Sequence, residues 1–249
     1  FSDATDNFEQ IFRGDNDSNN PIFLSELIIY NSDQSDKRRA IEESIATANG
    51  ITLGSFNRDG FVKTWYDQSV SDQSDAGSTP TGNHATQATA DNQPKIVNAG
   101  ALVTDGGLLF DGDNDFFDTG SSLSLGTEFF VTSVLNINTK VDSNGSIIGN
   151  SAGGGDDRLF IDTSNDKLSI RDGGVNIDSS FVTSQTQDNL STFQASSSSF
   201  TFVLDGNTDA KSALSTGKLF RYIGGGTGFN LSANMKELII YDTDQTDNR

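Results

Sequence analysis

Three aspartates alternate along one short stretch and could bind a hard cation. Asp111, Asp113 and Asp115 are separated by single residues, which is the spacing of the first three carboxylate ligands in a calcium loop. An EF-hand is excluded, because its sixth position needs Gly and its twelfth needs Glu, whereas Phe116 and Ser122 stand there. Two interpretations stay open: a calcium site of another kind, completed by a neighbouring loop, or an acidic hairpin end that binds nothing.

A second group of residues could bind a sugar. Trp65 and Tyr66 offer aromatic faces that could stack on a sugar ring, and Asp67 directly follows them. Side chains alternate from Phe61 to Tyr66, which indicates a strand with at least one of the two aromatic side chains in the core. Residues 65–67 are therefore the candidate ligand-binding residues, with a core position as the alternative for one aromatic ring.

The sequence lacks the residues that other common types of catalytic or metal site need. The chain has one His, His84, and no Cys, so no second ligand of these types completes a zinc site or a nucleophilic triad. The glycine runs at 153–155 and 224–226 lack the Lys and the strand-to-helix setting of a phosphate loop. We therefore expect no catalytic residue, and calcium is the one cofactor that stays a candidate.

The overall charge argues against two classes of partner. A net charge of −19 at pH 7 repels the phosphates of nucleic acids and of anionic membranes, because binding to either depends on Lys and Arg. The sequence has no run of about 18 apolar residues that could form a membrane-spanning helix. We therefore expect neither nucleic-acid binding nor membrane insertion.

The elements that would position the candidate residues are mostly short strands. Apolar runs of strand length alternate with Gly, Asn and Asp turns, and the chain has 25 Gly against 3 Pro. Asp172-Gly173-Gly174 and Asp205-Gly206-Asn207 have the composition of hairpin turns. Strands are expected at residues 24–30, 61–66, 94–97, 108–110, 128–137, 146–149, 158–162, 167–171, 189–195, 199–205, 218–223 and 236–242.

One short helix is expected among these strands. Asp33 or Ser35 can serve as its N-cap, and Asn49-Gly50 supply a left-handed stop. Many short strands with one helix, at this chain length, indicate an all-β fold, a jelly-roll β-sandwich. The apolar face of the helix is defined by three- and four-residue spacings between Ala40, Ile41, Ile45 and Ala48.

One sequence segment occurs twice in the chain. Glu26–Asp36 returns with few changes as Glu237–Asp247, a separation far above the period of about 20 to 50 residues found in solenoids. We therefore divide the chain into residues 1–50, the closing strands and helix of a preceding repeat or a linker segment, and residues 51–249, one complete sandwich. Either the chain is a slice of a longer tandem protein, or its N-terminal strands complete the sheet of a neighbouring subunit.

The run Trp65–Ser69, followed after an insertion by Gly82–Gln87 and Gln93–Val97, resembles a motif of the concanavalin A-like, laminin G-like jelly rolls of marine phage virion proteins. It is also similar to the catalytic domain of fungal-type α-L-arabinofuranosidase B. Phe110–Asp115 and Phe202–Gly206 are similar to further strand ends of these sandwiches. The resemblance implies a laminin G-like sandwich that extends to the C-terminus.

The resemblance implies hydrolase activity only if both carboxylates are present. The nucleophile of the hydrolase is a Glu in the stretch similar to Phe160–Asp166, where a Ser stands instead, and its acid is an Asp in the loop matching residues 224–227, which hold none. Because retaining hydrolysis needs both groups, we expect a non-enzymatic protein. A polysaccharide-active glycoside hydrolase is the alternative.

The resulting hypothesis is a structural or adhesive module of an extracellular assembly. The resemblance favours a phage virion appendage, such as a tail fibre, or a decoration protein, located outside the cell or on the virion. Its expected partners are other structural subunits or copies of itself, with carbohydrate binding to a cell-surface glycan as a further function. A tandem repeat of a bacterial surface adhesin is the third possibility.

Overall fold

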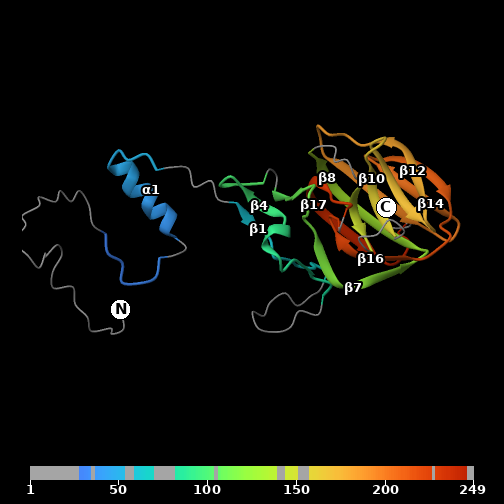
Figure 1. The fold of residues 1–249 in the computed structure, drawn as a ribbon, viewed down its shortest axis with the longest axis horizontal. Coiled ribbons are helices and arrows are strands. Elements are labelled where there is room, and N and C mark those ends of the chain that lie inside the picture. Colours follow the sequence, from blue (N-terminus) through green and yellow to red (C-terminus); the bar gives the residue numbers. More distant parts are fainter. Residues whose placement is uncertain are drawn as a thin grey trace, which may run out of the picture. The chain divides into compact units, whose positions relative to one another are not determined.

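The computed structural model (Figure 1) describes residues 28–34, 37–53, 59–69, 82–103, 106–138, 144–150, 157–225 and 228–245. Residues 1–55 and residues 56–249 form two separate compact units. In the first unit, Ile28, Ile29 and Tyr30 are exposed and belong to no strand. The strand expected at residues 24–30 is therefore not formed at its described end, and its first four residues lie outside the described part.

The first unit contains the expected helix, α1 (Arg38–Ala48). Its end is as predicted: Gly50 has a φ of 65°, and the Ile51 amide donates to the Ala46 carbonyl at 2.8 Å, as in a Schellman motif. The predicted start of the helix is wrong, because the residue at the N-cap is Lys37. The Lys37 side chain makes no capping hydrogen bond to any described residue. Asp33 lies too far upstream to reach the first free amides, and Ser35 is outside the described residues.

The second unit is a sandwich of two antiparallel sheets, which confirms the all-β, jelly-roll β-sandwich fold class (Figure 1). In its described residues, sheet A has nine strands, in the order β1-β4-β6-β17-β8-β13-β14-β15 with β5 beside β4, and sheet B has eight, in the order β12-β11-β10-β9-β16-β7-β3-β2. Sheet A consists of β1 (Gly60–Phe61), β4 (Lys95–Asn98), β5 (Ala101–Leu102), β6 (Leu108–Asp111), β8 (Phe129–Ile137), β13 (Asn189–Ala195), β14 (Ser199–Leu204), β15 (Asn207–Ser212) and β17 (Ser232–Tyr241). Sheet B consists of β2 (Thr64–Trp65), β3 (Ala85–Thr86), β7 (Phe117–Gly126), β9 (Gly145–Gly149), β10 (Arg158–Asp162), β11 (Lys167–Asp172), β12 (Val175–Val182) and β16 (Lys218–Ile223). A short 3-10 helix, η2 (Ala90–Asn92), precedes β4.

The core lies between the two sheets and is rich in phenylalanine. Strand β8 shows the pattern that builds it, since buried residues alternate with half-buried ones along its whole length. Burying one such phenylalanine stabilises the fold by roughly 1.5–3 kcal/mol. The phenylalanines of the core cluster are Phe110, Phe117, Phe129, Phe193, Phe200, Phe202 and Phe220.

The two predicted hairpin turns are confirmed. Asp205 and Gly206 join β14 to β15 with φ of 49° and 83°, and Gly173 and Gly174 join β11 to β12 with φ of 56° and 85°. Positive φ at both central residues is the type I′ geometry, whose twist matches that of the flanking strands. These turns place β12 and β15 at one end of each sheet's strand order.

Candidate functional site

A hollow of about 430 Å³ lies on the outward face of sheet A. Its volume is in the range of about 300–1,000 Å³ that is typical of small-ligand sites. The residues that line it come from the β4–β5 hairpin, β6, the end of β8 and β17: Asn98, Ala101, Leu102, Val103, Leu109, Asn136, Asn138, Asn234 and Lys236.

The register of three neighbouring strands brings together the side chains at the centre of the hollow. Asn234 on β17 pairs with Leu109 on β6 and with Asn136 on β8, so the three side chains form one row across neighbouring strands. Their chain neighbours Ala233 and Met235 are fully buried in the core. Because successive side chains of a strand point to opposite faces, this row points outward into the hollow.

A glycine makes room for the central asparagine. A Cβ added to Gly107 would lie only 1.9 Å from Oδ1 of Asn234, far inside any van der Waals contact. Gly107 therefore has no tolerated replacement while Asn234 keeps its position below the hollow. The sequence alone gave no reason to single out either residue.

One rim of the hollow carries an ion pair. Nζ of Lys236 donates to Oδ2 of Asp188 at 2.6 Å, and Nδ2 of Asn136 donates to Oδ1 of the same carboxylate at 3.1 Å. The hydrogen bond from Lys236, supported by the one from Asn136, lowers the pKa of Asp188. Asp188 thereby fixes the positions of one cation and one amide beside the hollow.

The chemistry of the lining is amide and aliphatic. Each Asn side chain offers a carbonyl acceptor and two N–H donors, which suits a ligand with many hydroxyl or amide groups. Leu102 is 71% exposed on the rim and offers apolar contact. Among the described lining residues there is no aromatic ring and no carboxyl group, so the lining offers hydrogen-bonding groups but no ring on which a ligand could stack.

The predicted sugar-binding residues lie elsewhere, at and beside β2 in sheet B. Trp65 packs against the core, with its ring centroid 6.0 Å from that of Phe117. Tyr66 is 51% exposed and contacts the His84 ring edge-on at 5.1 Å. Trp65 thus packs on the core, as predicted for at least one of the two aromatic residues. The single strand expected at residues 61–66 is wrong, because β1 belongs to sheet A, β2 belongs to sheet B, and Tyr66 follows the end of β2.

Asp67 organises the loop that follows β2. Its Oδ1 accepts hydrogen bonds from the amide and the hydroxyl of Ser69 at 2.9 and 2.6 Å, and its Oδ2 accepts one from the Asn83 amide at 3.0 Å. Burial alone would raise the pKa of Asp67, but these hydrogen bonds outweigh it and hold the pKa below its usual range. Asp67 thus joins two segments that are distant in sequence, and a ligand role for residues 65–67 stays a prediction.

The three alternating aspartates lie at the end of β6, which is Asp111, and in the turn that follows it, and they differ in their surroundings. Oδ1 of Asp111 accepts from the Asp113 and Asn114 amides at 2.8 and 3.2 Å, and Oδ2 of Asp115 accepts from the Asp111 amide at 3.0 Å. Asp115 is only 3% exposed, and burial together with the Asp111 charge raises its pKa to about 6. In the part of the chain that the structure describes, no group of three His, Cys, Asp or Glu side chains is placed to hold a metal ion, so calcium binding stays a prediction.

The stretch compared with the hydrolase nucleophile forms the turn between β10 and β11. Ser164 donates through its amide and its hydroxyl to Oδ1 of Asp162 at 2.8 and 2.6 Å. Asp162 is itself 9% exposed. These contacts form a local turn that connects the two strands of the hairpin.

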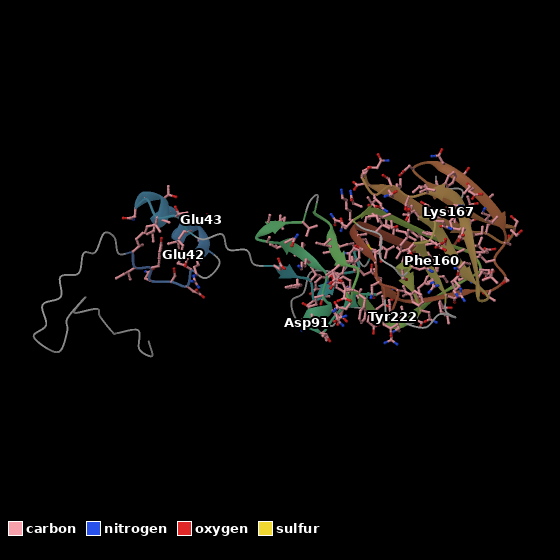
Figure 2. All side chains as sticks on the ribbon, turned by 45° about the horizontal axis from the view of Figure 1, so that its top comes forward. Glu42, Glu43, Asp91, Phe160, Lys167 and Tyr222 are labelled. Carbon is pink, nitrogen blue, oxygen red and sulfur yellow. The ribbon has the colours of Figure 1, made fainter. Side chains whose placement is uncertain are left out.

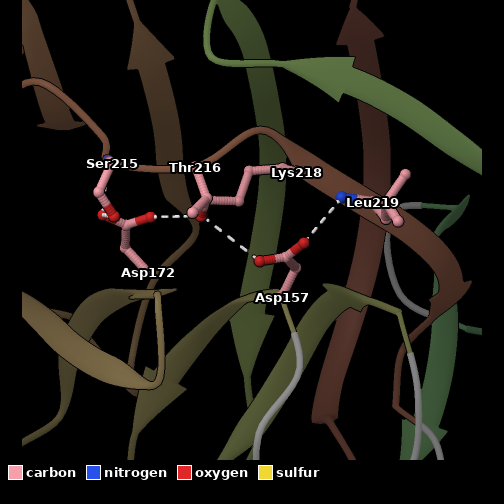
Figure 3. Close-up of polar contacts among 6 residues, drawn as sticks. All are labelled: Asp157, Asp172, Ser215, Thr216, Lys218 and Leu219. Carbon is pink, nitrogen blue, oxygen red and sulfur yellow. Dashed lines mark hydrogen bonds and ion pairs between the residues drawn. The ribbon is translucent and has the colours of Figure 1, made fainter.

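A buried lysine on sheet B is the polar cluster that sequence patterns did not reveal. Lys218 is completely buried, and its Nζ donates to Asp172 at 2.6 Å, Thr216 at 2.9 Å and Asp157 at 3.3 Å (Figure 3). An ammonium group has three donors, and all three are used. Burial alone would raise the pKa of Asp172, but its hydrogen bonds from Lys218, Ser215 and Thr216 hold it far below the usual range. The cluster connects β11, β16 and the residue before β10.

Comparison with known proteins gives only distant likenesses. No protein-family model and no curated protein matches the chain. Among solved structures, a Trypanosoma rangeli sialidase in complex with sialic acid matches at 13% identity and a TM-score of 0.44, over 63% of this chain and 28% of that one. The carbohydrate binding module CBM66 from Bacillus subtilis matches at 18% identity and a TM-score of 0.32, over 53% and 84% of the two chains. Domains LG4-5 of the mouse laminin alpha1 chain match at 12% identity and a TM-score of 0.38, over 60% of this chain and 47% of that one.

These matches assign no ligand and no activity, because every TM-score is low and every identity is below one in five. The chain spans little more than a quarter of the sialidase length. Among the described residues, no helix is long and apolar enough to cross a membrane. The functional argument therefore depends on the side chains of the chain itself.

Proposed function

We propose that the sandwich is a non-catalytic glycan-binding module that serves adhesion or assembly outside the cell. The observation that carries this proposal is the amide-lined hollow on sheet A. It combines four asparagine side chains, one lysine and an exposed leucine in a volume of about 430 Å³, room for one or two sugar rings at the scale of known ligand sites. Glycosidases of the retaining and inverting classes need two carboxyl groups at the substrate, and the described lining supplies none.

The chemistry of the hollow fits a polyhydroxylated ligand better than an apolar one. Sugar hydroxyls both donate and accept, as do the amides of Asn98, Asn136 and Asn138. The Lys236 ammonium keeps its orientation through Asp188, so less conformational freedom is lost when a ligand binds. The CH face of a sugar can contact Leu102, which is otherwise an unfavourably exposed apolar side chain.

A glycan array probed with the whole chain, followed by calorimetric titration of the best ligand, tests the proposal. Lys236→Met should weaken binding about tenfold through loss of a charge-assisted hydrogen bond, and Leu102→Ser should weaken it by a smaller factor. Lys211→Met is the matched control, because Lys211 forms a similar pair with Asp209 at 2.9 Å on β15, which contributes nothing to the lining. Equal losses in all three variants, or no binding of any glycan, would refute the assignment.

An assay for substrate turnover distinguishes the proposed binding module from a glycoside hydrolase. Release of sugar from a polysaccharide, or of arabinose from an aryl arabinofuranoside, by the purified chain would replace the binding proposal with a hydrolase. The proposed setting is an appendage or decoration of a phage virion, with other structural subunits or further copies as partners, or alternatively a bacterial surface adhesin. Capsid and tail genes beside the gene of this protein would favour the virion.

A further inference from the structure

Beyond the hollow, the outward face of sheet A carries two rows of uncharged side chains. Cross-strand register places one residue from each of β17, β8, β13, β14 and β15 in each row. The rows point away from the core, because residues between them along the strands, such as Val131, Phe193 and Phe202, belong to it. In strand order the first row is Tyr241, Phe130, Gln194, Thr201 and Ala210, and the second row is Ile239, Thr132, Thr192, Val203 and Thr208.

A face without charge is unusual on this protein. The chain has a net charge of −19 at pH 7, and 20% of its residues are charged. A charged ligand on these rows would lose hydration without gaining an opposite charge, so the rows suit an uncharged ligand. The outward positions of sheet B differ, since they include Asp118, Lys167, Arg171 and Asp178 (Figure 2 labels Lys167).

Two apolar side chains are well exposed on this face. Leu190 is 49% exposed and pairs with Val134, in a row that lies between the hollow and the two uncharged rows. Tyr241 is 48% exposed and pairs with Phe130, and the two rings meet edge-on with their centroids 6.1 Å apart. Contact with Phe130 orients the Tyr241 ring, which can stack on the CH face of a sugar. Exposed apolar groups gathered on one face mark a binding surface.

The hollow and Tyr241 lie at opposite ends of one strip of sheet A. Asn136 lines the hollow, and Phe130, the partner of Tyr241, lies further back on the same strand β8. A rise of about 3.4 Å per residue puts about 20 Å between Asn136 and Phe130. The hollow has room for one or two sugar rings, so a glycan that reaches from it to Tyr241 is an extended chain of several rings.

Charged groups border the uncharged rows at both ends. At the Tyr241 end, Asp244 accepts a hydrogen bond from Nε2 of Gln194 at 2.8 Å. At the hollow end lie Glu237, beside Val134 in the strand register, and the ion pair of Lys236 with Asp188. Carboxylates thus outnumber cations among the described groups at these borders. They repel an anionic polymer and leave a neutral one unaffected.

A second copy of this chain fits the face less well than a glycan. Five strands spaced about 4.8 Å apart, with the row of Leu190 included, cover about 19 Å by about 14 Å. A stable protein–protein interface buries roughly 800 Å² on each partner, which is more than this face offers. A linear glycan needs contact only along a narrow strip, and the strip from the hollow to Tyr241 supplies it.

We propose that sheet A binds an extended, uncharged polysaccharide, with one end of the bound stretch in the hollow and a later sugar ring stacked on Tyr241. This inference rests on the proposed glycan-binding function and names the class of glycan, a linear neutral polymer. Between the two ends, CH groups of the chain contact Leu190, Val134 and Ile239. Each added contact contributes affinity, so affinity rises with chain length until the chain reaches Tyr241.

Calorimetric titration of the whole chain with oligosaccharides of two lengths tests the proposal. The probes are the disaccharide and the hexasaccharide of three uncharged linear polymers, namely cellulose, chitin and arabinan. In at least one series we expect the hexasaccharide to bind about tenfold more tightly than the disaccharide. The disaccharide reports on the hollow alone, and the hexasaccharide reports on the hollow together with the Tyr241 end.

Variants at the far end of the strip locate the added contact. Tyr241→Ala should weaken hexasaccharide binding about fivefold and leave disaccharide binding unchanged, which also shows that the variant is folded. Tyr241→Phe keeps the ring and should bind like the parent chain. Val182→Ser is the control, because Val182 is 59% exposed on β12 of sheet B, and it should change neither affinity. Lys236→Met should weaken both lengths.

Several results would overturn the extended site. It is refuted if disaccharide and hexasaccharide bind equally in every series, if none of the probes binds, or if Tyr241→Ala binds the hexasaccharide like the parent chain. Light scattering that shows a dimer of the free chain, lost in Leu190→Ser, would assign the face to a second copy instead. Equal binding of both lengths, weakened by Lys236→Met, would refute the extended site and leave the hollow as the glycan site.

Discussion

Two lysine–aspartate pairs of this sandwich have the same contact distance and different roles. Lys218 reaches Asp172 at 2.6 Å with side-chain exposures of 0% and 8%, and Lys236 reaches Asp188 at 2.6 Å with exposures of 17% and 42%. The first pair holds strands of sheet B together inside a buried cluster, whereas the second lies at the rim of the hollow on sheet A. Burial, and not the length of the contact, therefore distinguishes a structural ion pair from one available for binding.

Removing the buried cation should have the largest effect. Lys218→Ala leaves Asp172 and Asp157 without their shared cation in a site that water reaches poorly, and we expect a loss of about 3–5 kcal/mol in the free energy of unfolding. Lys236→Ala, the matched change at the exposed pair, should cost less than about 1 kcal/mol. Urea unfolding of both variants measures the difference. Equal losses of unfolding free energy would contradict the conclusion that burial distinguishes the two ion pairs.

Neutralising the buried carboxylate should have a smaller effect that depends on pH. Because the folded-state pKa of Asp172 is lowered, its contribution is present above the unfolded pKa of about 4 and is lost as the pH falls through the folded value. Asp172→Asn should cost about 1.5–3 kcal/mol at pH 7, and the gap to the parent chain should close in acid. Asp188→Asn should show a pH dependence of the same sign, because the pKa of Asp188 is also lowered, but a much smaller loss of stability, because the group is exposed to solvent. An acid dependence as large as that of Asp172→Asn would contradict the comparison.

Asp115 extends the comparison to a buried carboxylate that forms no ion pair with any described lysine, and on which Lys95 acts only as a more distant charge. Its folded pKa is raised from 3.8 to about 6, so the folded state binds its proton more readily than the unfolded state. This group alone makes the protein less stable as the pH rises from about 4 to about 6. The pKa difference limits the effect to about 3 kcal/mol, and solvent screening of the neighbouring Asp111 and Asp113 reduces it to roughly 1 kcal/mol.

Asp115→Asn should therefore raise stability at pH 7 by about that amount and remove this part of the pH dependence. Thermal unfolding across pH 4 to 7 measures both quantities, and Asp113→Asn serves as the exposed control. A variant less stable than the parent chain at pH 7 would show that the Asp115 charge has a favourable partner, as a bound cation would be.

Salt should produce the smallest effect. In about 1 M NaCl, where screening acts over about 3 Å, the small cost of Lys236→Ala should vanish. The cost of Lys218→Ala should stay nearly constant, since buried pairs are screened much less. Urea titrations at two salt concentrations test this, and a parallel response of the two variants would mean that water reaches both pairs equally.

Much of the fold was predictable because local signals and tertiary packing agree there. The expected limits of β10, β13 and β16 match the observed strands, since their apolar runs are bounded by turn residues. Strand β7 was missed because Phe117–Gly126 contains two Gly and four Ser or Thr residues, a composition typical of a loop. It is held as a strand by its pairing with β16, which is not visible in its own sequence.

The sites were less predictable, because strand pairing assembles them from distant residues. Asn98 and Lys236 line one hollow although most of the sandwich sequence lies between them, and nothing in either local sequence marks it as a lining residue. The candidate aspartates and aromatic residues, in contrast, were conspicuous because they are neighbours in sequence. Neighbouring carboxylates turned out to accept hydrogen bonds from their own turns, which is the commonest use of Asp in such places.

The repeated sequence segment occurs once in β17 of sheet A and once near the start of the chain, at Glu26–Asp36. Strand β17 pairs with β6 on one side and β8 on the other, and Leu238 and Ile240 pack on the core. The first copy has the same alternation of residues and is synthesised before any strand of the sandwich. Long-range strand pairing is slow, and unpaired edges stay open until the last strand arrives. The segment that belongs between β6 and β8 is therefore the last strand of the sandwich to be synthesised, after a segment of nearly the same sequence has already been made.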